Sequence, residues 1–215
     1  FDWVVDKAFS SVPSWHPAVD KIIKTDHRNW KKQLFSSESR EALKLVKKEI
    51  NATDYDFVVD MQNNLKSAFL SFLSDHRVTG MDASSSREYP AHWAYSNKVN
   101  INKSLHAIDR QKKLLASSLG YSPASDINYG VSKIKFLEPA MALPDNYVVL
   151  VQNASWPTKQ WPVACWKYLV KHFDDCGVNV LLPSGNREEL MRAKDIASVS
   201  KKATALEILP LNEVA

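Results

Sequence analysis

The stretch that decides the fold is Tyr147 to Pro162, which reads Tyr-Val-Val-Leu-Val-Gln-Asn-Ala-Ser-Trp-Pro-Thr-Lys-Gln-Trp-Pro. Its first five residues form a continuous apolar run, which is typical of a strand buried on both faces in a parallel sheet. A polar loop follows, and Pro162 then leads into an apolar periodicity from Val163 to Phe173 that predicts a helix. The order strand, loop, helix is the repeating unit of an α/β protein.

The loop in this unit carries groups that can hold an anion. Ligands of open α/β sheets bind beyond the carboxyl ends of the strands, and this loop offers the hydroxyl of Ser155, backbone N–H groups and the ammonium of Lys159. The alternative is an ordinary strand–helix connection with a solvated lysine. From the loop alone the ordinary connection is favoured, because the glycine pattern of a dinucleotide or P-loop site is missing.

Length and composition restrict the class of protein. A chain of 215 residues is long enough for one large or two small domains, and 45% hydrophobic and 24% charged residues are usual for a globular protein. The net charge of +4 is too small to indicate a nucleic-acid partner without a local patch. No apolar run is as long as a membrane span. Cys165 and Cys176 have no metal or redox spacing, so we expect buried thiols in a reducing compartment.

The two ends of the chain look like interior sequence. Residues 1–5 already resemble a strand, with no methionine before them, and residues 211–215 resemble the first residues of a helix. A parallel sheet that stopped at these points would keep unpaired edges. We therefore expect the chain to be a piece of a longer protein, truncated at both ends.

The rest of the sequence forms two strand–helix series. The first has expected strands at 1–5, 22–23, 57–60 and 80–82, and expected helices at 38–50, 65–73, from 84 onward, and at 105–119 with Gly120 as its C-cap. The second has strands at 147–151, 178–182 and 206–209 and helices at 163–173 and 187–197. Between them, three prolines and an edge-strand pattern at 133–137 interrupt the rhythm. This predicts two α/β domains, residues 1–142 and 143–215, with right-handed parallel connections.

Two groups of cations in the first series can bind an anionic ligand. Arg28, Lys31 and Lys32 surround Trp30 just after a predicted strand, and Arg pairs bidentately with carboxylates and phosphates. A solvated helix start explains this cluster equally well. Arg87 is expected in the first turn of a helix, where the macrodipole disfavours a cation. We therefore expect an anionic ligand or a carboxylate such as that of Asp82 to hold it.

One acidic position in the second series has two interpretations. Glu188 and Glu189 follow the Gly185 loop, in the first turn of a predicted helix. A carboxylate at that strand end can accept hydrogen bonds from two ribose hydroxyls, but glutamate at a helix N-terminus is stabilising with no ligand at all. The pattern alone favours the second interpretation. The sequence contains no paired carboxylates, no histidine cluster of metal type and no Gly-x-Ser-x-Gly elbow, so it offers no candidate for a nucleophilic mechanism.

Several stretches, taken in order, carry a resemblance to a known family. They are Phe1 to Val5, Pro13 to Val19, Asp60-Met61-Gln62 with Leu65 to Ala68, Gly80-Met81-Asp82 with Ser86-Arg87-Glu88, His106 to Arg110 with Ser118 to Tyr121, Lys159 to Pro162, and Leu182 to Gly185. Each is weak by itself, but their order and spacing are specific and cover nearly the whole chain. The chain resembles glycosyltransferase family 9, the heptosyltransferases of lipopolysaccharide core biosynthesis in Gram-negative bacteria.

The resemblance implies a fold and a reaction. The fold is α/β of GT-B type, two Rossmann-like domains with mainly parallel sheets that face a cleft. Residues 1–142 bind the acceptor, Kdo₂-lipid A at the inner-membrane surface, and residues 143–215 bind ADP-L-glycero-D-manno-heptose. Heptose passes to a Kdo hydroxyl with inversion, with no metal and no cofactor. The implied location is cytoplasmic and peripheral on the inner membrane, with no transmembrane segment and no nucleic-acid partner.

The family's functional residues carry over to particular positions. Lys159 matches the lysine at the donor phosphates and has the catalytic role of stabilising the leaving group. Ser155 and Glu189 match donor-binding positions at the phosphates and the ribose. Four cations match positions that bind the anionic acceptor, namely Arg28, Lys31, Lys32 and Arg87. The catalytic aspartate base is expected before residue 1, and a further donor motif after residue 215, so we expect the chain alone to be inactive.

The chain also departs from the family pattern. Ala154 and Trp156 stand where many relatives have a hydroxyl and an arginine, Asn63 replaces a usual glycine, and Asn29 replaces a cation. The alternative functions are heptosyltransferase II or another family 9 enzyme and, for the chain alone, an inactive module that binds anionic glycolipids. A nicotinamide oxidoreductase is a poor third, because no Gly-x-Gly-x-x-Gly follows any strand.

Overall fold

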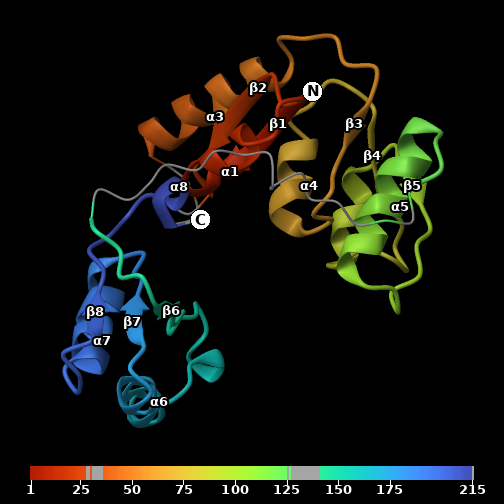
Figure 1. The fold of residues 1–215 in the computed structure, drawn as a ribbon. Coiled ribbons are helices and arrows are strands. Elements are labelled where there is room, and N and C mark those ends of the chain that lie inside the picture. The colour runs from red at the N-terminus through yellow and green to blue at the C-terminus, as the bar shows by residue number, and fades with distance from the viewer. Residues whose placement is uncertain (28–29, 31–35, 125, 127–140, 215) are drawn as a thin grey trace. The chain divides into compact units, whose positions relative to one another are not determined.

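The computed structural model describes residues 1–27, 30, 36–124, 126 and 141–214. The chain divides into two compact units, Phe1–Lys133 and Ile134–Ala215. Both units combine helices with sheets in which every strand pair is parallel (Figure 1). This confirms the α/β class with parallel sheets. The expected boundary between residues 142 and 143 stays a prediction, since residues 127–140 lie outside the described part of the chain.

The first unit contains two parallel sheets. β1 (Asp2–Asp6) pairs with β2 (Lys21–Thr25), and a second sheet has the order β3 (Val58–Val59), β4 (Val78–Met81) and β5 (Asn97–Val99). The four expected strands of this unit are confirmed. β5 was not predicted, because Asn-Lys-Val has neither the length nor the alternation of a typical strand. Its pairing with Thr79 to Met81 of β4 defines it.

The helices of the first unit begin and end at recognisable caps. The unit contains η1 (Lys7–Phe9), α1 (Ser11–Ser14), α3 (Ser37–Ile50), α4 (Leu65–Ser71), η2 (Tyr89–Ala94) and α5 (Ala107–Leu119). The Ser36 hydroxyl accepts a hydrogen bond from the Ser39 N–H at the start of α3 (3.1 Å), and Asn64 forms a capping box with Ser67 at the start of α4. Gly120 ends α5 in the left-handed conformation (φ 72°), as predicted.

The helix predicted to start at Ser84 is wrong. The carboxylate of Asp82 accepts hydrogen bonds from the Ser85 N–H and the Ser84 hydroxyl, both at 2.8 Å, and this side chain holds residues 83–85 in a turn. Helical structure begins only at η2, so Arg87 lies in a loop before the helix and not in its first turn. The Asp82 carboxylate, one of the two kinds of partner expected for Arg87, binds this turn instead.

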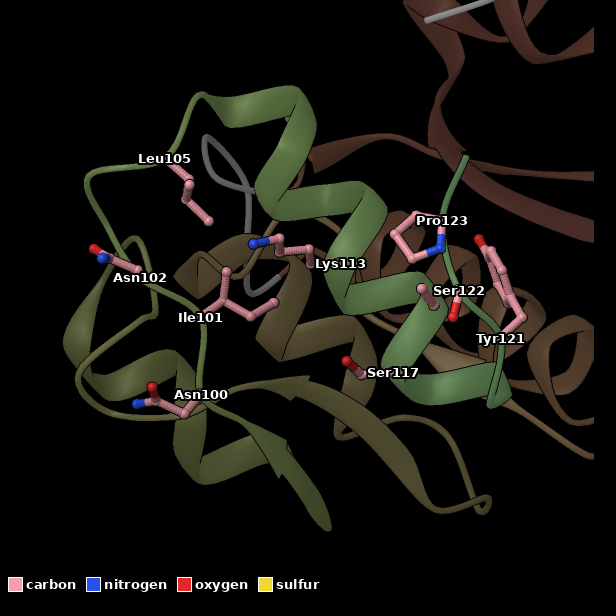
Figure 2. A pocket seen from close by; sticks show the side chains of 10 residues that line it. Asn100, Ile101, Asn102, Leu105, Lys113, Ser117, Tyr121, Ser122 and Pro123 are labelled. Atoms are coloured by element: carbon pink, nitrogen blue, oxygen red, sulfur yellow. The ribbon is translucent and has the colours of Figure 1, made fainter. Parts of the chain in front are cut away.

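A shallow hollow lies beside α5. It has a volume of about 310 Å³ and is bounded by the loop after β5, one side of α5 and residues 121–123. Figure 2 shows Lys113 and Ser117 on the side of α5 that faces Asn100, Ile101 and Asn102. No residue that the sequence assigned to a site lines this hollow.

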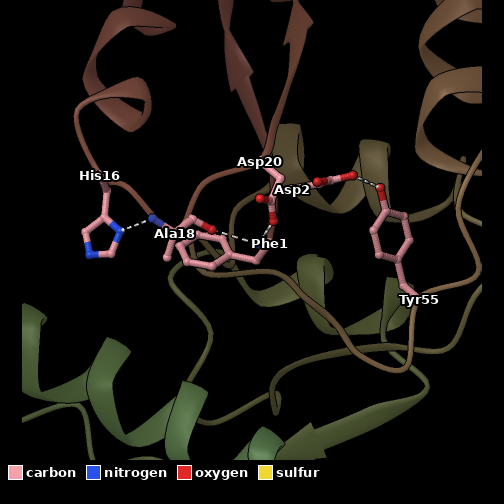
Figure 3. Close-up of polar contacts among 6 residues, drawn as sticks. All are labelled: Phe1, Asp2, His16, Ala18, Asp20 and Tyr55. Carbon is pink, nitrogen blue, oxygen red and sulfur yellow. Dashed lines mark hydrogen bonds and ion pairs between the residues drawn. The ribbon is translucent and has the colours of Figure 1, made fainter.

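The start of β1 is fixed by polar contacts with two neighbouring segments. The ammonium group of Phe1 donates to the Ala18 carbonyl (2.8 Å) and pairs with the Asp20 carboxylate (2.7 Å), as drawn in Figure 3. The Tyr55 hydroxyl donates to the carboxylate of Asp2. Burial raises the pKa of Tyr55, and the hydrogen bond to Asp2 raises it further. The register of β1 on β2 is therefore supported by side chains as well as by the ladder.

The aromatic residue of the predicted cation cluster belongs to the core. Trp30 is 6% exposed and packs in a cluster with Ile23, Val46 and Ile50. The ring of His27 lies edge-on to it, with 5.3 Å between ring centroids, and burial lowers the pKa of His27. Trp30 thus anchors the segment after β2 and is not free to stack on a ligand.

A close approach between β4 and η2 organises the second sheet. A Cβ atom on Gly80 would lie 2.3 Å from the Tyr95 ring, so only glycine fits under that ring. The buried Tyr95 hydroxyl donates to the Asp60 carboxylate at 2.7 Å. Burial raises the pKa of Tyr95 far above its ordinary value, and the negative charge of Asp60 raises it further. This contact joins the end of η2 to the residue that follows β3.

In its described residues, the second unit is a three-stranded parallel sheet with helices. Its sheet order is β6 (Tyr147–Val149), β7 (Asn179–Leu182) and β8 (Ala203–Ala205), and its helices are η4 (Pro157–Lys159), α6 (Val163–Asp175), α7 (Arg187–Ala197) and α8 (Leu211–Val214). The two predicted long helices are confirmed. The strand predicted at 206–209 is wrong, because the register with β7 places Ala203–Ala205 opposite Val180–Leu182 and only the Leu206 N–H continues the ladder.

One face of this sheet carries the core of the second unit. Val170 of α6 and Ala193 and Ile196 of α7 pack against Val180 and Leu182, with Val148 of β6 beside them. The expectation that β6 is buried on both faces is wrong. Val149, which points to the other face, is 50% exposed, because β6 is the edge strand and the core cluster covers only one side.

Two further expectations from composition have different outcomes. No helix in the described part of the chain is long and apolar enough to cross a membrane. Cys165 is half-buried, but Cys176 is exposed, so the expectation of two buried thiols is wrong. Cys176 is the C-cap of α6, and a residue at the end of a helix projects beyond the face that packs on the sheet.

Candidate functional site

The carboxyl ends of β6 and β7 are joined by a buried glutamine. Gln152, the second residue of the loop after Leu150, is only 2% exposed, and its side-chain N–H donates to the Pro183 carbonyl at 3.1 Å. Just before it, the Leu150 N–H donates to the Leu181 carbonyl at 2.9 Å. The two loops that leave the sheet at this edge therefore lie side by side, which is where ligands of open α/β sheets bind.

Three side chains at this edge keep buried polar atoms without a partner among the described residues. These atoms are the amide oxygen of Gln152, both amide atoms of Asn153, and the hydroxyl of Ser184, which is 6% exposed. Buried polar atoms of proteins nearly always have a hydrogen-bond partner. A cluster that contains donors and acceptors can bind a ligand with phosphate oxygens and hydroxyl groups.

The predicted phosphate-binding residues lie on the same loop. Ser155 and Lys159 are both exposed, and Lys159 is the last residue of η4. The loop folds back on itself through hydrogen bonds from the Lys159 N–H to the Trp156 carbonyl (2.9 Å) and from the Gln160 side chain to the Ala154 carbonyl (2.8 Å). No ion pair joins the Lys159 ammonium to any described carboxylate. Its positive charge remains available to an anion.

Glu189 already has one partner. It lies in the first turn of α7, and one of its carboxylate oxygens accepts a hydrogen bond from the Gly185 N–H at 2.8 Å. The Asn186 side chain caps the helix by accepting from the Glu189 N–H at 2.9 Å. This contact belongs to the helix-stabilising interpretation. The role of Glu189 toward a ribose stays a prediction. In that role, its other carboxylate oxygen would accept the hydrogen bond from the ribose.

Two helix N-termini add to the positive potential at this edge. α6 and α7, with 13 and 11 residues, both begin where loops leave the sheet, and α6 has no side-chain cap. The first N–H groups of a helix and its macrodipole favour an anion. Together with Lys159, these helix starts give the edge groups that can bind an anion, next to polar groups that can bind hydroxyls.

The predicted acceptor residues are described only in part. Arg28, Lys31 and Lys32 lie outside the described residues. Arg87 is exposed on the loop after β4, and its N–H donates to the Asn63 carbonyl at 3.1 Å. No described carboxylate forms an ion pair with its guanidinium. The structure therefore brings Arg87 to the carboxyl edge of the second sheet and leaves the other three cations as predictions.

Asn63 connects the loops at that edge. It adopts a positive φ of 52° and is 1% exposed. Its side-chain N–H donates to the Asp60 carbonyl (2.7 Å), and its side-chain oxygen accepts from the Met81 N–H. Asparagine tolerates the left-handed conformation better than most residues, so the departure from the usual glycine preserves the turn and adds two contacts.

The same edge contains a network of hydrogen bonds around Asp82 that the sequence did not predict. The Asp82 carboxylate accepts hydrogen bonds from Asn100 (2.7 Å), Ser85 and Ser84. The hydrogen bond from Asn100 is the largest cause that holds the pKa of Asp82 far below its usual range. The sequence could not pair these residues because Asn100 belongs to the loop after the unpredicted strand β5. Among the described residues, no three His, Cys, Asp or Glu side chains come together as a metal site.

Comparisons with known proteins agree on one family. The model of "Glycosyltransferase family 9 (heptosyltransferase)" matches residues 43–215. Lipopolysaccharide heptosyltransferase 1 of Salmonella typhimurium is 36% identical over all of this chain and 68% of its own length. Lipopolysaccharide heptosyltransferase 1 of Pseudomonas aeruginosa is 34% identical over 98% of this chain and 59% of its own length. The chain thus spans between 59% and 68% of these two relatives.

Solved structures agree with the sequence comparisons. The E. coli heptosyltransferase WaaC with ADP-2-deoxy-2-fluoro heptose has a TM-score of 0.86 and 33% identity, over all of this chain and 68% of that one. E. coli ADP-heptose lps heptosyltransferase II has a TM-score of 0.64 at 16% identity and so supports the fold alone. The GT-B type of α/β fold predicted from the sequence is thereby confirmed. The family model and the relatives together show that this chain belongs to glycosyltransferase family 9, the heptosyltransferases.

Proposed function

We propose that this chain is part of a glycosyltransferase that moves L-glycero-D-manno-heptose from ADP-heptose to the Kdo residue of the Kdo-lipid A inner core. The second unit binds the donor and the first unit binds the acceptor. Relatives named lipopolysaccharide heptosyltransferase 1, at 34% to 36% identity, support this reaction over that of heptosyltransferase II. The stretches Phe1 to Val5 and His106 to Arg110 favour the same type.

One observation carries the donor half of the proposal. The unpartnered polar atoms of Gln152, Asn153 and Ser184 stand at one sheet edge with the unpaired ammonium of Lys159. Phosphate oxygens can accept from the ammonium and the Ser184 hydroxyl, and ribose hydroxyls can bind the amide groups. The structurally similar WaaC was solved with an ADP-heptose analogue.

The transfer is an inverting displacement at the anomeric carbon of heptose. The acceptor oxygen forms a bond to this carbon from one side while the bond to the diphosphate oxygen breaks on the other side. A general base takes the proton of the acceptor hydroxyl. ADP leaves with the electron pair of the broken bond. Lys159 stabilises the negative charge that develops there, so the proposed reaction requires no metal and no cofactor.

The acceptor half of the proposal concerns a lipid-linked, anionic sugar. Arg28, Lys31, Lys32 and Arg87 are the proposed contacts with its carboxylate and phosphate groups. Because Kdo₂-lipid A is anchored in a bilayer, the enzyme acts as a peripheral protein on the cytoplasmic face of the inner membrane. No nucleic acid takes part.

Calorimetric titration with ADP tests the donor site directly. The chain is expected to bind ADP, and Ser184→Ala is expected to weaken binding about tenfold, which corresponds to one lost hydrogen bond to a charged group. Ser198→Ala removes a hydroxyl whose hydrogen bond stays within the end of α7 (2.7 Å to the Asp195 carbonyl) and serves as the matched control. Equal ADP affinity in the wild type and in Ser184→Ala would show that the edge is not a nucleotide site.

A further inference from the structure

The helix α4 carries apolar side chains on its outer side as well as on its inner side. Leu65, Phe69 and Phe72 are 52%, 42% and 65% exposed. Their spacing of four and three residues places them on one stripe of the helix. On its buried side, α4 packs Ala68, which is 3% exposed, into the core. The outer stripe is therefore additional apolar surface that the fold of the described residues does not bury.

The neighbouring helix η2 adds two exposed aromatic rings. Tyr89 and Trp93 are 62% and 66% exposed, and their centroids lie 6.4 Å apart in an edge-to-face arrangement. His92, which is 9% exposed, contacts both rings, and Ala91 is fully buried beneath them. The two rings are thus held on a short, anchored helix.

The contacts between α4 and η2 place the two groups of exposed side chains on neighbouring elements. The carboxylate of Glu88 accepts a hydrogen bond from the Leu65 N–H at 2.8 Å, which joins the start of α4 to the residue before Tyr89. Ala68 of α4 packs with Ala91 and Tyr95 of the η2 segment. Five large apolar side chains on two packed elements exceed the scattered exposure that is normal for a protein surface. We call this set, Leu65, Phe69, Phe72, Tyr89 and Trp93, the α4–η2 surface.

The chemistry of the α4–η2 surface fits the interfacial region of a lipid bilayer. Trp and Tyr prefer that region, because their rings are apolar and their N–H and O–H groups stay hydrated. Exposed Lys66 and Arg87 adjoin the surface in the sequence. They outnumber the neighbouring carboxylate of Glu88, which keeps its negative charge while it accepts a hydrogen bond from the Leu65 N–H. The surface therefore presents apolar rings with available cations at its margin, which is complementary to an anionic membrane.

The position of the surface connects it to the candidate acceptor site. Arg87, which the sequence assigns to the anionic acceptor, is followed by Glu88 and then by Tyr89, the first residue of η2. We propose that the α4–η2 surface docks the protein on the lipid bilayer that carries the acceptor. This inference rests on the proposed function, because the acceptor of the proposed reaction is a sugar linked to a membrane lipid.

Sedimentation with vesicles tests the proposal. The chain is incubated with vesicles of phosphatidylcholine alone or with phosphatidylglycerol, and the bound fraction is compared with that of the double variant Phe72→Ser/Trp93→Ser. We expect the variant to lose at least about tenfold in partitioning, since burial of one large apolar side chain changes an equilibrium constant by roughly that factor. Phosphatidylglycerol should strengthen the binding of the wild-type chain.

The matched control is Tyr168→Ser/Met191→Ser in the second unit, where the two side chains are 77% and 64% exposed. It should bind vesicles like the wild type, and circular dichroism should show that both double variants are folded. Equal vesicle binding by the wild type and Phe72→Ser/Trp93→Ser would overturn the proposal. It would also be overturned if vesicle binding were absent and the variant changed only the oligomeric state, which would assign the surface to a second copy of the chain.

The ADP titration separates this proposal from the proposed function. Phe72→Ser/Trp93→Ser should bind ADP like the wild type, and in protein with transferase activity it should act normally on a water-soluble Kdo acceptor but poorly on one in vesicles. Equal loss with both acceptors would overturn the docking role. Failure of the wild type to bind ADP would instead contradict the donor site. The vesicle assay would still decide whether the α4–η2 surface binds a bilayer.

Discussion

Lys159 is the residue on which the proposed mechanism depends most directly. Its ammonium is exposed at the end of η4 and has no described ion-pair partner. Because negative charge grows on the leaving ADP, a cation fixed there stabilises the transition state more than the bound donor. In protein with transferase activity, Lys159→Ala should lower kcat roughly a hundred- to thousandfold, or about 2.7–4 kcal/mol. Steady-state kinetics with ADP-heptose measure this.

The melting temperature distinguishes this role from a structural one. An exposed charge contributes only about 0–1 kcal/mol to stability, so Lys159→Ala should melt close to the wild type. Lys171→Ala, an exposed lysine of α6, is the control and should change neither kcat nor melting. Near-native kcat in Lys159→Ala would remove this lysine from the mechanism.

Asn63 combines a strained conformation with buried hydrogen bonds. Asn63→Ala loses both side-chain contacts, leaves the Met81 N–H without its partner and keeps a Cβ atom at positive φ. We expect a loss of about 2–4 kcal/mol in the free energy of unfolding. Asn63→Gly should lose about 1 kcal/mol less, because glycine adopts this conformation without strain. Urea denaturation of the two variants measures the difference, and equal losses would show that the conformation costs nothing.

The sequence predicted these residues unequally well. Lys159 was predicted from a loop after a strand and from the resemblance. Arg87 was predicted from the resemblance and from an expected place in a helix, which was wrong. Both side chains are exposed in the structure, and their roles stay predictions. Gln152 and Ser184 could not be assigned to the candidate donor site from the sequence. They are buried where two loops meet, and the hydrogen bond that joins these loops connects residues 31 positions apart. For Glu189 the sequence left a helix-stabilising role open, and its hydrogen bond with Gly185 shows the physical basis of that role.

At the scale of elements, a close contact joins β4 to Tyr95, the C-cap of η2. A Cβ atom on Gly80 would overlap three atoms of the Tyr95 ring at 2.3 to 2.6 Å. The ring cannot move away freely, since its hydroxyl is bound to Asp60. Gly80→Ala should therefore destabilise the protein by about 1–3 kcal/mol or more, as overpacked cores do. Thermal or urea unfolding measures this loss.

Gly185→Ala is the matched control for that substitution. Its Cβ atom would meet only the Glu189 carboxylate, at 3.3 Å, and a flexible side chain can shift by a few tenths of an ångström. Its effect on stability should be clearly smaller. A loss as large as that of Gly80→Ala would mean that contact with the Tyr95 ring is not the cause of the loss.

The turn after β4 should make the free energy of unfolding depend on pH, through the carboxylate of Asp82. Asn100 and two serines depress the pKa of Asp82 in the folded protein, so an unfolded chain takes up a proton there more readily than the folded one. This contribution to stability is present above the ordinary Asp value of 3.8 and is lost as the pH falls toward the folded pKa.

Asp82→Asn should therefore destabilise the protein at neutral pH, and its difference from the wild type should shrink as the pH falls below about 5. Urea unfolding at several pH values measures this trend. Asp175→Asn, the same substitution at an exposed position of α6, is the matched control. A constant difference for Asp82→Asn at all pH values would contradict the assignment.

Long amphipathic helices could be predicted from the sequence, and short elements could not. α3, α6 and α7 follow apolar periodicities of 11 to 14 residues, and their observed bounds agree closely with those expected. β5 and β8 contain three residues each and are defined by the strands beside them. The false helix at Ser84 had a hydroxyl-rich start, but the carboxylate of Asp82 engages the same groups in a turn.

At the scale of the whole molecule, the division into two α/β units followed from the break in rhythm around the central prolines. The family followed from motifs spread over both units, and the comparisons confirm it. The unburied side of β6 and the α4–η2 surface could not be predicted, because an apolar residue in a sequence does not reveal whether another element covers it. The roles of three cations stay predictions, because Arg28, Lys31 and Lys32 themselves lie outside the described residues.

The buried hydroxyl of Tyr95 gives the folded protein a spectroscopic signature in base. The sequence contains seven tyrosines, and burial beside Asp60 keeps Tyr95 protonated after an ordinary phenol, with a pKa near 10.0, has ionised. The raised pKa of Tyr95 stabilises the folded protein fully at pH values below the ordinary phenol pKa of 10.0. This stabilisation is lost as the pH rises from there toward the folded pKa. In an alkaline titration, the phenolate absorbance of Tyr95 should therefore appear together with cooperative loss of helical signal, at a higher pH than that of an ordinary phenol.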